Sequence, residues 1–272
     1  MSSTLRVAAV QAESVAGDVE ANVATAVSLV TAAGERGARV VVLPELFLSG
    51  YSPETWGLES SVTTSDPRLE PLRTTARRHA AVVVTGAAVR RTDDSSTLSL
   101  LVFDGDGSVH APYDKQHLFG EETDFFTPGD HGASIVVDGW ELGLGICYDG
   151  CFPEHAAAAA AAGAGAYLCP SAYLAGSEHR RDLYYAARAL DNGVYVVFAG
   201  LAGSCGGTRF SGGSAVYDPE GRPVDRAGDE APAVVVADLD AAELVRVRDL
   251  NPLARDRLAG QGQRTRQVLT PR

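Results

Sequence analysis

The segment Leu144-Gly145-Ile146-Cys147-Tyr148-Asp149 combines a short apolar strand with a cysteine at the end of that strand. Phe152-Pro153-Glu154 follows and predicts a helix, because proline is favoured in a first helical turn. A cysteine at such a turn lies near a helix N-terminus, whose partial positive charge favours the thiolate. The pattern indicates an activated nucleophile at Cys147. A lone cysteine after an apolar strand is nevertheless more often a small buried packing residue.

Two other segments place a reactive residue directly after a strand. Val40–Leu43 is followed by Pro44 and Glu45, and Tyr113-Asp114 is followed by Lys115. In open α/β sheets, ligands bind outside the carboxyl ends of the strands, so side chains placed there can converge. Taken singly, such a glutamate is typical of a loop or a helix cap, and a single lysine is typical of the surface. Together, the three segments predict one reactive site.

Strand and helix patterns alternate along the chain, which is typical of α/β layers. We expect strands at Leu5–Gln11, Arg39–Leu43, Ala81–Gly86, Leu98–Phe103, Leu142–Ile146, Ala166–Cys169, Val194–Ala199 and Ala233–Asp238. We expect helices at Val19–Arg36, Leu69–His79, His155–Ala162 and Arg181–Asn192. Two turn signals, Asp104-Gly105-Asp106-Gly107 and Asp218-Pro219-Glu220-Gly221, predict hairpins and hence a mixed sheet. We expect a single domain over residues 1–260 and a polar tail over residues 261–272.

Composition and charge exclude several classes of protein. The formal net charge of −12 argues against a nucleic-acid partner, which would require a basic surface. The N-terminal segment lacks the basic start and the long apolar stretch of a signal peptide, and no run of 18 apolar residues appears. A cytoplasmic location is the default expectation. Four cysteines and six scattered histidines form neither a disulfide framework nor a metal motif. We therefore expect no metal site.

In this order and with these neighbours, the segments resemble the three catalytic blocks of the nitrilase (carbon–nitrogen hydrolase) superfamily, in its amidase-like branch. The blocks are Pro44-Glu45-Leu46-Phe47-Leu48-Ser49-Gly50-Tyr51, Tyr113-Asp114-Lys115-Gln116-His117-Leu118-Phe119, and Gly145-Ile146-Cys147-Tyr148-Asp149 closed by Phe152-Pro153-Glu154. Each block alone is moderately specific, whereas all three in order are very specific. With further matching pieces, the resemblance extends roughly from Val7 to Arg257.

The resemblance implies a four-layer αββα sandwich that usually pairs into homodimers across its helices. It also implies a role for each site residue. Glu45 would be the general base and Cys147 the nucleophile, while Lys115 and the backbone N–H of Tyr148 would hold the oxyanion. Glu122 would support Lys115 as a second glutamate, although its neighbour Glu121 is close enough to be confused with it.

Other positions concern the substrate pocket. Tyr51, Phe119, Tyr148, Tyr173 and Phe210 are candidate pocket walls, although aromatic residues at such positions are equally typical of a core. Many relatives carry arginine where this chain has Cys151, which we expect to be a packing residue; its replacement weakens any expectation of acid-bearing substrates. The adjacent Arg180 and Arg181 could recruit an anionic group, but a solvated helix face is the commoner reason for such a pair.

The activity that the resemblance implies is hydrolysis of a small carboxamide to carboxylate and ammonia through a thioester. This route needs neither a metal nor an organic cofactor, so we expect none. Tyr148-Asp149 after the cysteine resembles amidases, whereas true nitrilases generally carry Trp-Glu there. An N-carbamoyl (ureido) substrate is the runner-up, and a nitrilase or a catalytically silent binding protein of the same fold is the remaining alternative. A serine hydrolase is excluded because the chain lacks a G-x-S-x-G elbow.

Overall fold

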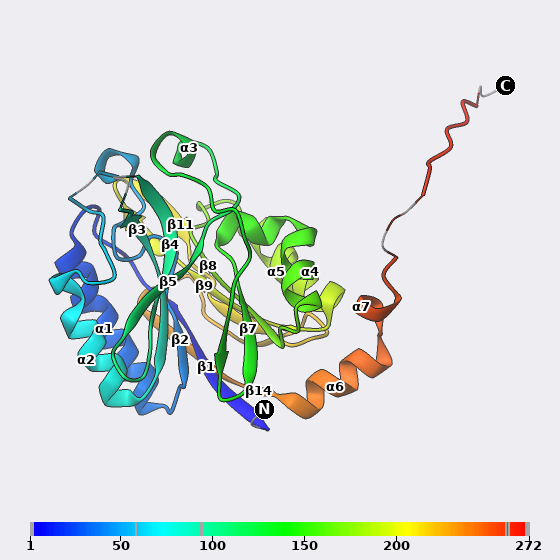
Figure 1. Ribbon diagram of the computed structural model, residues 1–272, viewed down its shortest axis with the longest axis horizontal. Helices are drawn as coiled ribbons and strands as arrows, with labels where there is room; N and C mark the ends of the chain where they lie inside the picture. The colour runs from blue at the N-terminus through cyan, green and yellow to red at the C-terminus, as the bar shows by residue number, and fades with distance from the viewer. Residues whose placement is uncertain (1–2, 58, 93–94, 259, 261, 270–272) are drawn as a thin grey trace.

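A computed structural model describes residues 3–57, 59–92, 95–258, 260 and 262–269 of the chain. Two six-stranded sheets pack face to face, with helices on the outside of each (Figure 1). The four-layer αββα sandwich expected from the resemblance is therefore confirmed. Among the described residues, no helix combines the length and apolar character needed to span a membrane.

The first sheet has the order β14-β1-β2-β3-β4-β5, in which β1, β2 and β3 run parallel. Helices α1 (Val19–Glu35) and α2 (Glu70–His79) lie on its outer side (Figure 1). Asp18 caps the start of α1 by accepting a hydrogen bond from the Ala21 N–H at 3.0 Å. The strands are β1 (Thr4–Gln11), β2 (Val40–Val42), β3 (Val82–Arg90), β4 (Ser96–Phe103), β5 (Val109–Asp114) and β14 (Ala233–Asp240).

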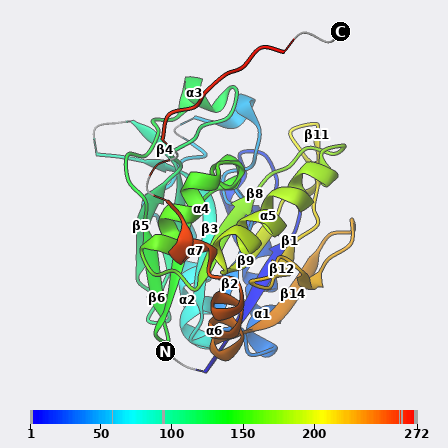
Figure 2. The same cartoon turned by 90° about the vertical axis from the view of Figure 1, so that its right-hand side faces the viewer.

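The second sheet has the order β13-β12-β9-β8-β7-β6, with β7, β8 and β9 parallel. Helices α4 (Pro153–Ala161) and α5 (Glu178–Asn192) lie on its outer side, and α6 (Ala241–Leu250) and α7 (Leu253–Asp256) continue along the same face of the molecule (Figure 2). The strands are β6 (Ser134–Val137), β7 (Trp140–Leu144), β8 (Ala166–Ser171), β9 (Tyr195–Gly200), β12 (Ala215–Tyr217) and β13 (Pro223–Arg226). A separate hairpin pairs β10 (Ala202–Cys205) with β11 (Thr208–Ser211).

Strand β1 shows why these strands are apolar at nearly every position. Val7 and Ala9 point into the core between the two sheets, whereas Ala8 and Val10 pack in the layer under α1 and α2. Successive side chains of a strand point to opposite faces, so a strand covered on both faces needs apolar residues throughout. This double burial gives the continuous apolar runs visible in the sequence.

All eight predicted strands, all four predicted helices and both hairpins are present, with ends shifted by a few residues. For β5 and β13, the return strands of the two predicted hairpins, the sequence supplied no bounds. It did not reveal β6, β10, β11, the short helix α3 (Glu122–Phe125), α6 or α7. In the predicted tail, residues 262–269 are exposed and form neither helix nor strand.

The turn after β2 packs unusually close to β3. Leu46 has a φ of 47°, in the left-handed region that non-glycine residues rarely adopt. A Cβ atom added at Gly86 would lie 2.3 Å from the Leu46 nitrogen and 2.8 Å from the Cα of Glu45. The Gly86 N–H also donates to the Pro44 carbonyl at 3.1 Å. Gly86 thus permits the backbone contact that places Glu45.

We expect Gly86→Ala to lower the free energy of unfolding by about 1–3 kcal/mol, because the added methyl group must displace backbone rather than a flexible side chain. Gly228→Ala is the control, since a Cβ atom at that position meets nothing within 4 Å. Denaturant titration of both variants measures the difference. Equal free energies of unfolding in the two variants would contradict the proposed close contact.

Candidate active site

A buried lysine forms hydrogen bonds with two glutamates at one end of the first sheet. Lys115 follows β5, and its Nζ donates to Oε1 of Glu45 at 2.6 Å and to Oε1 and Oε2 of Glu122 at 2.8 and 2.7 Å. Glu45 follows β2, and Glu122 begins α3. The side chains of all three residues are fully buried. Because Lys115 binds Glu122, the placement favours Glu122 over its neighbour Glu121 as the supporting glutamate.

The charges in this cluster control one another. Burial lowers the pKa of Lys115, but the negative charges of Glu45 and Glu122 outweigh burial and raise it, so the lysine stays charged. Burial raises the pKa of Glu45 to about 7; Lys115 opposes this shift and the charge of Glu122 adds to it. The Oε2 atom of Glu45 is buried without a hydrogen-bond partner among the described residues. A carboxylate with a pKa near neutrality and a free oxygen is suited to proton transfer.

Cys147 lies at the end of β7, in the first position of a short 3₁₀ helix (Cys147–Cys151). Its φ of 42° lies in the left-handed region, a strain that often marks reactive residues. Burial and the charge of Glu45 raise the pKa of Cys147 well above its ordinary value, against the effect of Lys115. Burial and the nearby carboxylate thus outweigh the groups that favour the thiolate, and the resting thiol is protonated.

Asp149 holds the turn that carries Cys147, a role that the sequence analysis missed. Its carboxylate accepts hydrogen bonds from the backbone N–H of Ile146 at 3.0 Å and of His117 at 2.9 Å. It also accepts from the hydroxyl of Tyr113 at 2.6 Å. Asp149 thereby joins the segment that follows Lys115 to the segment that carries Cys147. The position of Asp149 in the third sequence block indicated that it could matter, but its partners Tyr113 and His117 lie more than 30 residues away in the sequence.

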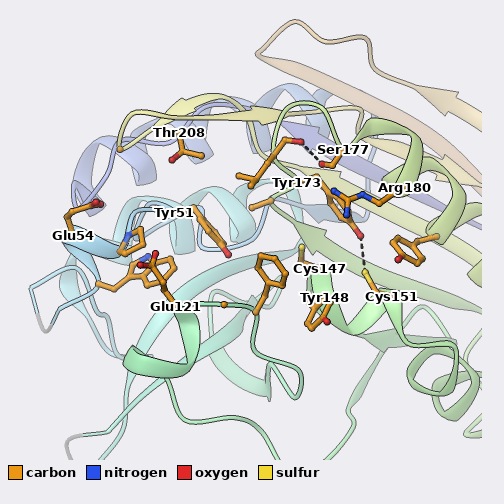
Figure 3. A pocket seen from close by; sticks show the side chains of 18 residues that line it. Tyr51, Glu54, Glu121, Cys147, Tyr148, Cys151, Tyr173, Ser177, Arg180 and Thr208 are labelled. Carbon is orange, nitrogen blue, oxygen red and sulfur yellow. Dashed lines mark hydrogen bonds between the residues drawn. The ribbon is translucent and has the colours of Figure 1, made fainter.

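A cavity of about 510 Å³ opens above Cys147 (Figure 3). Four of the predicted wall residues line it, namely Tyr51, Phe119, Tyr148 and Tyr173. Tyr51 also donates its hydroxyl hydrogen to Oε1 of Glu122 at 2.6 Å, which links the cavity wall to the charged cluster. Phe210 does not line the cavity; it is buried behind Tyr51, with ring centroids 5.6 Å apart. Phe210 is therefore a core residue and not a wall of the cavity.

Two further expectations need correction. Cys151 is not simply a packing residue, because it lines the cavity and its Sγ lies 3.3 Å from the Tyr173 hydroxyl. Arg181 does not lie on a solvated face: it is 2% exposed and donates to the carbonyl oxygens of Ser211 and Gly212 at 3.0 and 2.7 Å. Arg180, in contrast, is exposed at the wall of the cavity. Among the described residues, no group of three or more His, Cys, Asp or Glu side chains could hold a metal ion.

An αββα sandwich that gathers a cysteine, a lysine and two glutamates beneath a cavity defines a class of enzymes that hydrolyse carbon–nitrogen bonds. Residues 6–249 match the model of the carbon-nitrogen hydrolase family. The chain belongs to this family and is a carbon–nitrogen hydrolase that acts on amides.

Three relatives illustrate the similarity. A nitrilase from Pyrococcus abyssi is 32% identical over 93% of this chain and 97% of its own length. An omega-amidase from Saccharomyces cerevisiae is 31% identical over 94% of each chain. The crystallised amidase of a Nesterenkonia species, a double mutant in complex with acrylamide, is 31% identical with a TM-score of 0.83, covering 94% of this chain and 95% of its own.

The raised pKa of Glu45 predicts the pH dependence of amide hydrolysis. If the unprotonated carboxylate is the reactive form, kcat/KM should rise with pH and level off above about pH 7. Glu122→Gln removes a negative charge that raises the pKa of Glu45, so the rising limb should move to lower pH even as the rate falls. Glu121→Gln is the control and should leave the limb in place. A pH–rate series on the three proteins measures this, and an unmoved limb in Glu122→Gln would contradict the coupling.

Proposed function

We propose that the protein is a Cys147-dependent amidase that converts a small carboxamide to a carboxylate and ammonia through a thioester. The observation that carries this proposal is the buried Lys115 bridge between Glu45 and Glu122, next to a cysteine on the floor of the cavity. These side chains supply a base, a nucleophile and a fixed positive charge within one site.

The first half-reaction transfers the acyl group to sulfur. Because the Cys147 thiol is neutral at rest, its proton must leave as the sulfur attacks the amide carbon, and Glu45 is the acceptor. The carbonyl oxygen gains negative charge in the tetrahedral intermediate. When the C–N bond breaks, protonated Glu45 returns the proton to the leaving nitrogen, which departs as ammonia. The acyl group then remains bound to Sγ.

Two hydrogen-bond donors stabilise the developing oxyanion. The Lys115 ammonium supplies a full charge, and the second donor is the backbone N–H of Tyr148. The first residues of a 3₁₀ helix have N–H groups with no intrahelical acceptor, and Tyr148 is the second residue of Cys147–Cys151. Asp149 fixes this turn through the Ile146 N–H. The Tyr148 donor is therefore in place before the substrate binds.

The second half-reaction uses the same base. Glu45 takes a proton from water as that water attacks the thioester, and it gives this proton to Sγ as the C–S bond breaks, which restores the Cys147 thiol. The product acid loses its remaining proton to solvent and leaves as the carboxylate. A Nesterenkonia amidase crystal structure carries the acetamide moiety of fluoroacetamide on its active-site cysteine. That adduct supports a cysteine nucleophile in a chain 31% identical to this one.

We expect Cys147→Ala to abolish ammonia release from a panel of amides, ureides and nitriles while the protein still folds. Cys169→Ala and Cys205→Ala are the controls, because both cysteines are buried and neither lines the cavity. Ureide turnover would release carbon dioxide as well as ammonia and would favour the ureido alternative. Rapidly quenched wild-type reactions should carry the acyl mass on the peptide that contains Cys147. An adduct only on another cysteine would refute the nucleophile assignment.

Removal of the charged residues near Cys147 should lower the rate of amide hydrolysis nearly as much as removal of Cys147 itself. Lys115→Ala should lower kcat about 10²–10³-fold through the lost oxyanion donor, and Glu45→Gln about 10²–10⁴-fold through the lost base. Glu122→Gln should be severe, since it leaves Lys115 with one carboxylate, whereas Glu121→Gln should be mild. Steady-state kinetics on the four variants tests these roles. The reverse ranking of the two glutamates would assign the supporting role to Glu121.

We further propose that the protein forms a homodimer through the face that carries α4 and α5. The alanines of α4 permit close approach of a second helix, and Leu183 and Leu190 on α5 are 67% and 42% exposed. Light scattering at micromolar concentration should give about twice the chain mass of 28.4 kDa. Leu183→Glu should shift the protein toward monomer, whereas Val136→Glu, at a similarly exposed position on β6, should not. A wild-type monomer would contradict this proposal.

A further inference from the structure

A series of hydrogen bonds between side chains leads to the turn that carries Cys147. The hydroxyl of Tyr167, on β8, lies 2.9 Å from Nδ1 of His155, on α4. Nε2 of His155 lies 2.8 Å from the hydroxyl of Tyr113, on β5, and this hydroxyl donates to Asp149 at 2.6 Å. The hydrogen-bond series therefore joins the first sheet to α4 and the second sheet, and it ends on the carboxylate that holds the turn.

The members of this hydrogen-bond series are withdrawn from water. Tyr113 and Tyr167 are 1% and 0% exposed, and the side chains of His155 and Asp149 are 6% and 0% exposed. A Cβ atom added at Gly145 would lie 1.9 Å from the Tyr167 hydroxyl oxygen. The glycine therefore lets the series approach the backbone just before the reactive cysteine. In such a buried network each hydrogen bond depends strongly on its neighbours.

The carboxylate of Asp149 determines the direction of every hydrogen bond in the series. Both of its oxygens accept from backbone N–H groups, so it also accepts from Tyr113, whose single hydroxyl hydrogen points to it. The Tyr113 oxygen must then accept from His155, which places the ring hydrogen on Nε2. Nδ1 is left to accept from the Tyr167 hydroxyl. Burial lowers the pKa of His155 and outweighs the charge of Asp149, so the imidazole is neutral, as this arrangement requires.

We propose that neutral His155 is a positioning residue for amide hydrolysis, which acts on the Cys147 turn through Tyr113 and Asp149. This inference rests on the proposed amidase function. A tyrosine hydroxyl can rotate to suit a different acceptor. Because the His155 N–H occupies one side of the Tyr113 oxygen, the hydroxyl hydrogen stays directed at Asp149.

The alignment of Asp149 has consequences for the reaction. Its Oδ2 atom accepts from both the Tyr113 hydroxyl and the Ile146 N–H, so a change at one bond disturbs the other. The Ile146 bond supports the left-handed backbone of Cys147 and, with it, the direction of the next N–H, which is the proposed oxyanion donor. His155 is not among the residues that line the cavity. Its loss should therefore slow the chemical step and leave substrate binding nearly unchanged.

Steady-state kinetics with the fastest amide of the panel tests whether His155 acts through Tyr113. His155→Leu should lower kcat about 10- to 100-fold, because a small misplacement of reacting groups has effects of this size, while KM stays within about threefold. His155→Gln should recover much of the loss, since a glutamine amide can donate toward Tyr113 and accept from Tyr167. Tyr113→Phe should match His155→Leu, and the double variant should be no slower than Tyr113→Phe alone.

The matched control is Tyr195→Phe, which removes another buried hydroxyl, one that bonds to the backbone of Asp240. It should leave kcat unchanged. Thermal unfolding of all variants separates positioning from packing: a lower Tm for His155→Leu with unchanged kcat in the folded protein would overturn the proposal. Equal losses of kcat from His155→Leu with and without the Tyr113 hydroxyl would also overturn it, because His155 would then act by another route.

Hydrogen exchange followed by mass spectrometry examines the same turn without any substrate. His155→Leu and Tyr113→Phe should each speed exchange in the peptide that contains residues 146–149, whereas Tyr195→Phe should not. If this result came with no ammonia release by wild type, the amidase proposal alone would fail, and the control of the turn by His155 would be supported. Unchanged exchange in both variants would overturn the role assigned to His155.

Discussion

The structure of the site depends on one buried ion cluster, in which Lys115 lies between Glu45 and Glu122. Removing three charges from water is costly unless their geometry lets them compensate one another. The protein meets this requirement with backbone contacts on both sides of the lysine. The Lys115 N–H donates to the Leu98 carbonyl, and its carbonyl accepts from the Gly129 N–H, at 2.8 and 2.9 Å. β4 and the segment after α3 thus fix the backbone of Lys115, and its ammonium is held by the two carboxylates.

The second constraint is backbone strain at the two turns that carry reactive residues. Leu46, which directly follows Glu45, and Cys147 itself both have a positive φ. Such conformations persist only where the surroundings over-determine them. Around Leu46 this support comes from the Gly86 contact, and around Cys147 it comes from Asp149 and from the Tyr185 hydroxyl, which donates to the Cys147 carbonyl at 3.1 Å. The Gly86 and Tyr185 contacts join segments that are remote in sequence, whereas the bond between Asp149 and Ile146 is local.

This distinction explains which features the sequence could reveal. Glu45 and Cys147 each follow a strand that the sequence predicts, so a reactive site at strand ends could be inferred from pattern alone. Lys115 follows β5, the return strand of a predicted hairpin, and Cys147 belongs to the other sheet, so only the fold shows how the three residues meet. The role of Asp149 could not, because its partners Tyr113 and His117 approach it only when the two sheets pack together. The protonation state of Cys147 could not be inferred for the same reason: the local helix end is visible in the sequence, whereas burial and the charge of Glu45 are not. Arg180 and Arg181 look alike in sequence, yet the fold buries one and exposes the other.

A neutral resting thiol is compatible with the proposed reaction when the whole charge balance of the site is considered. Transfer of the Cys147 proton to Glu45 alone would be unfavourable, because the pKa of Glu45 is about 7 and that of the thiol lies well above its ordinary value. Attack on the amide, however, moves the new negative charge from sulfur to the carbonyl oxygen. Glu45 then becomes neutral as the oxyanion forms beside Lys115, so the net charge of the buried cluster stays constant. The lysine exchanges one anionic partner for another, and its fixed position makes the proton transfer favourable only when an amide carbonyl is present.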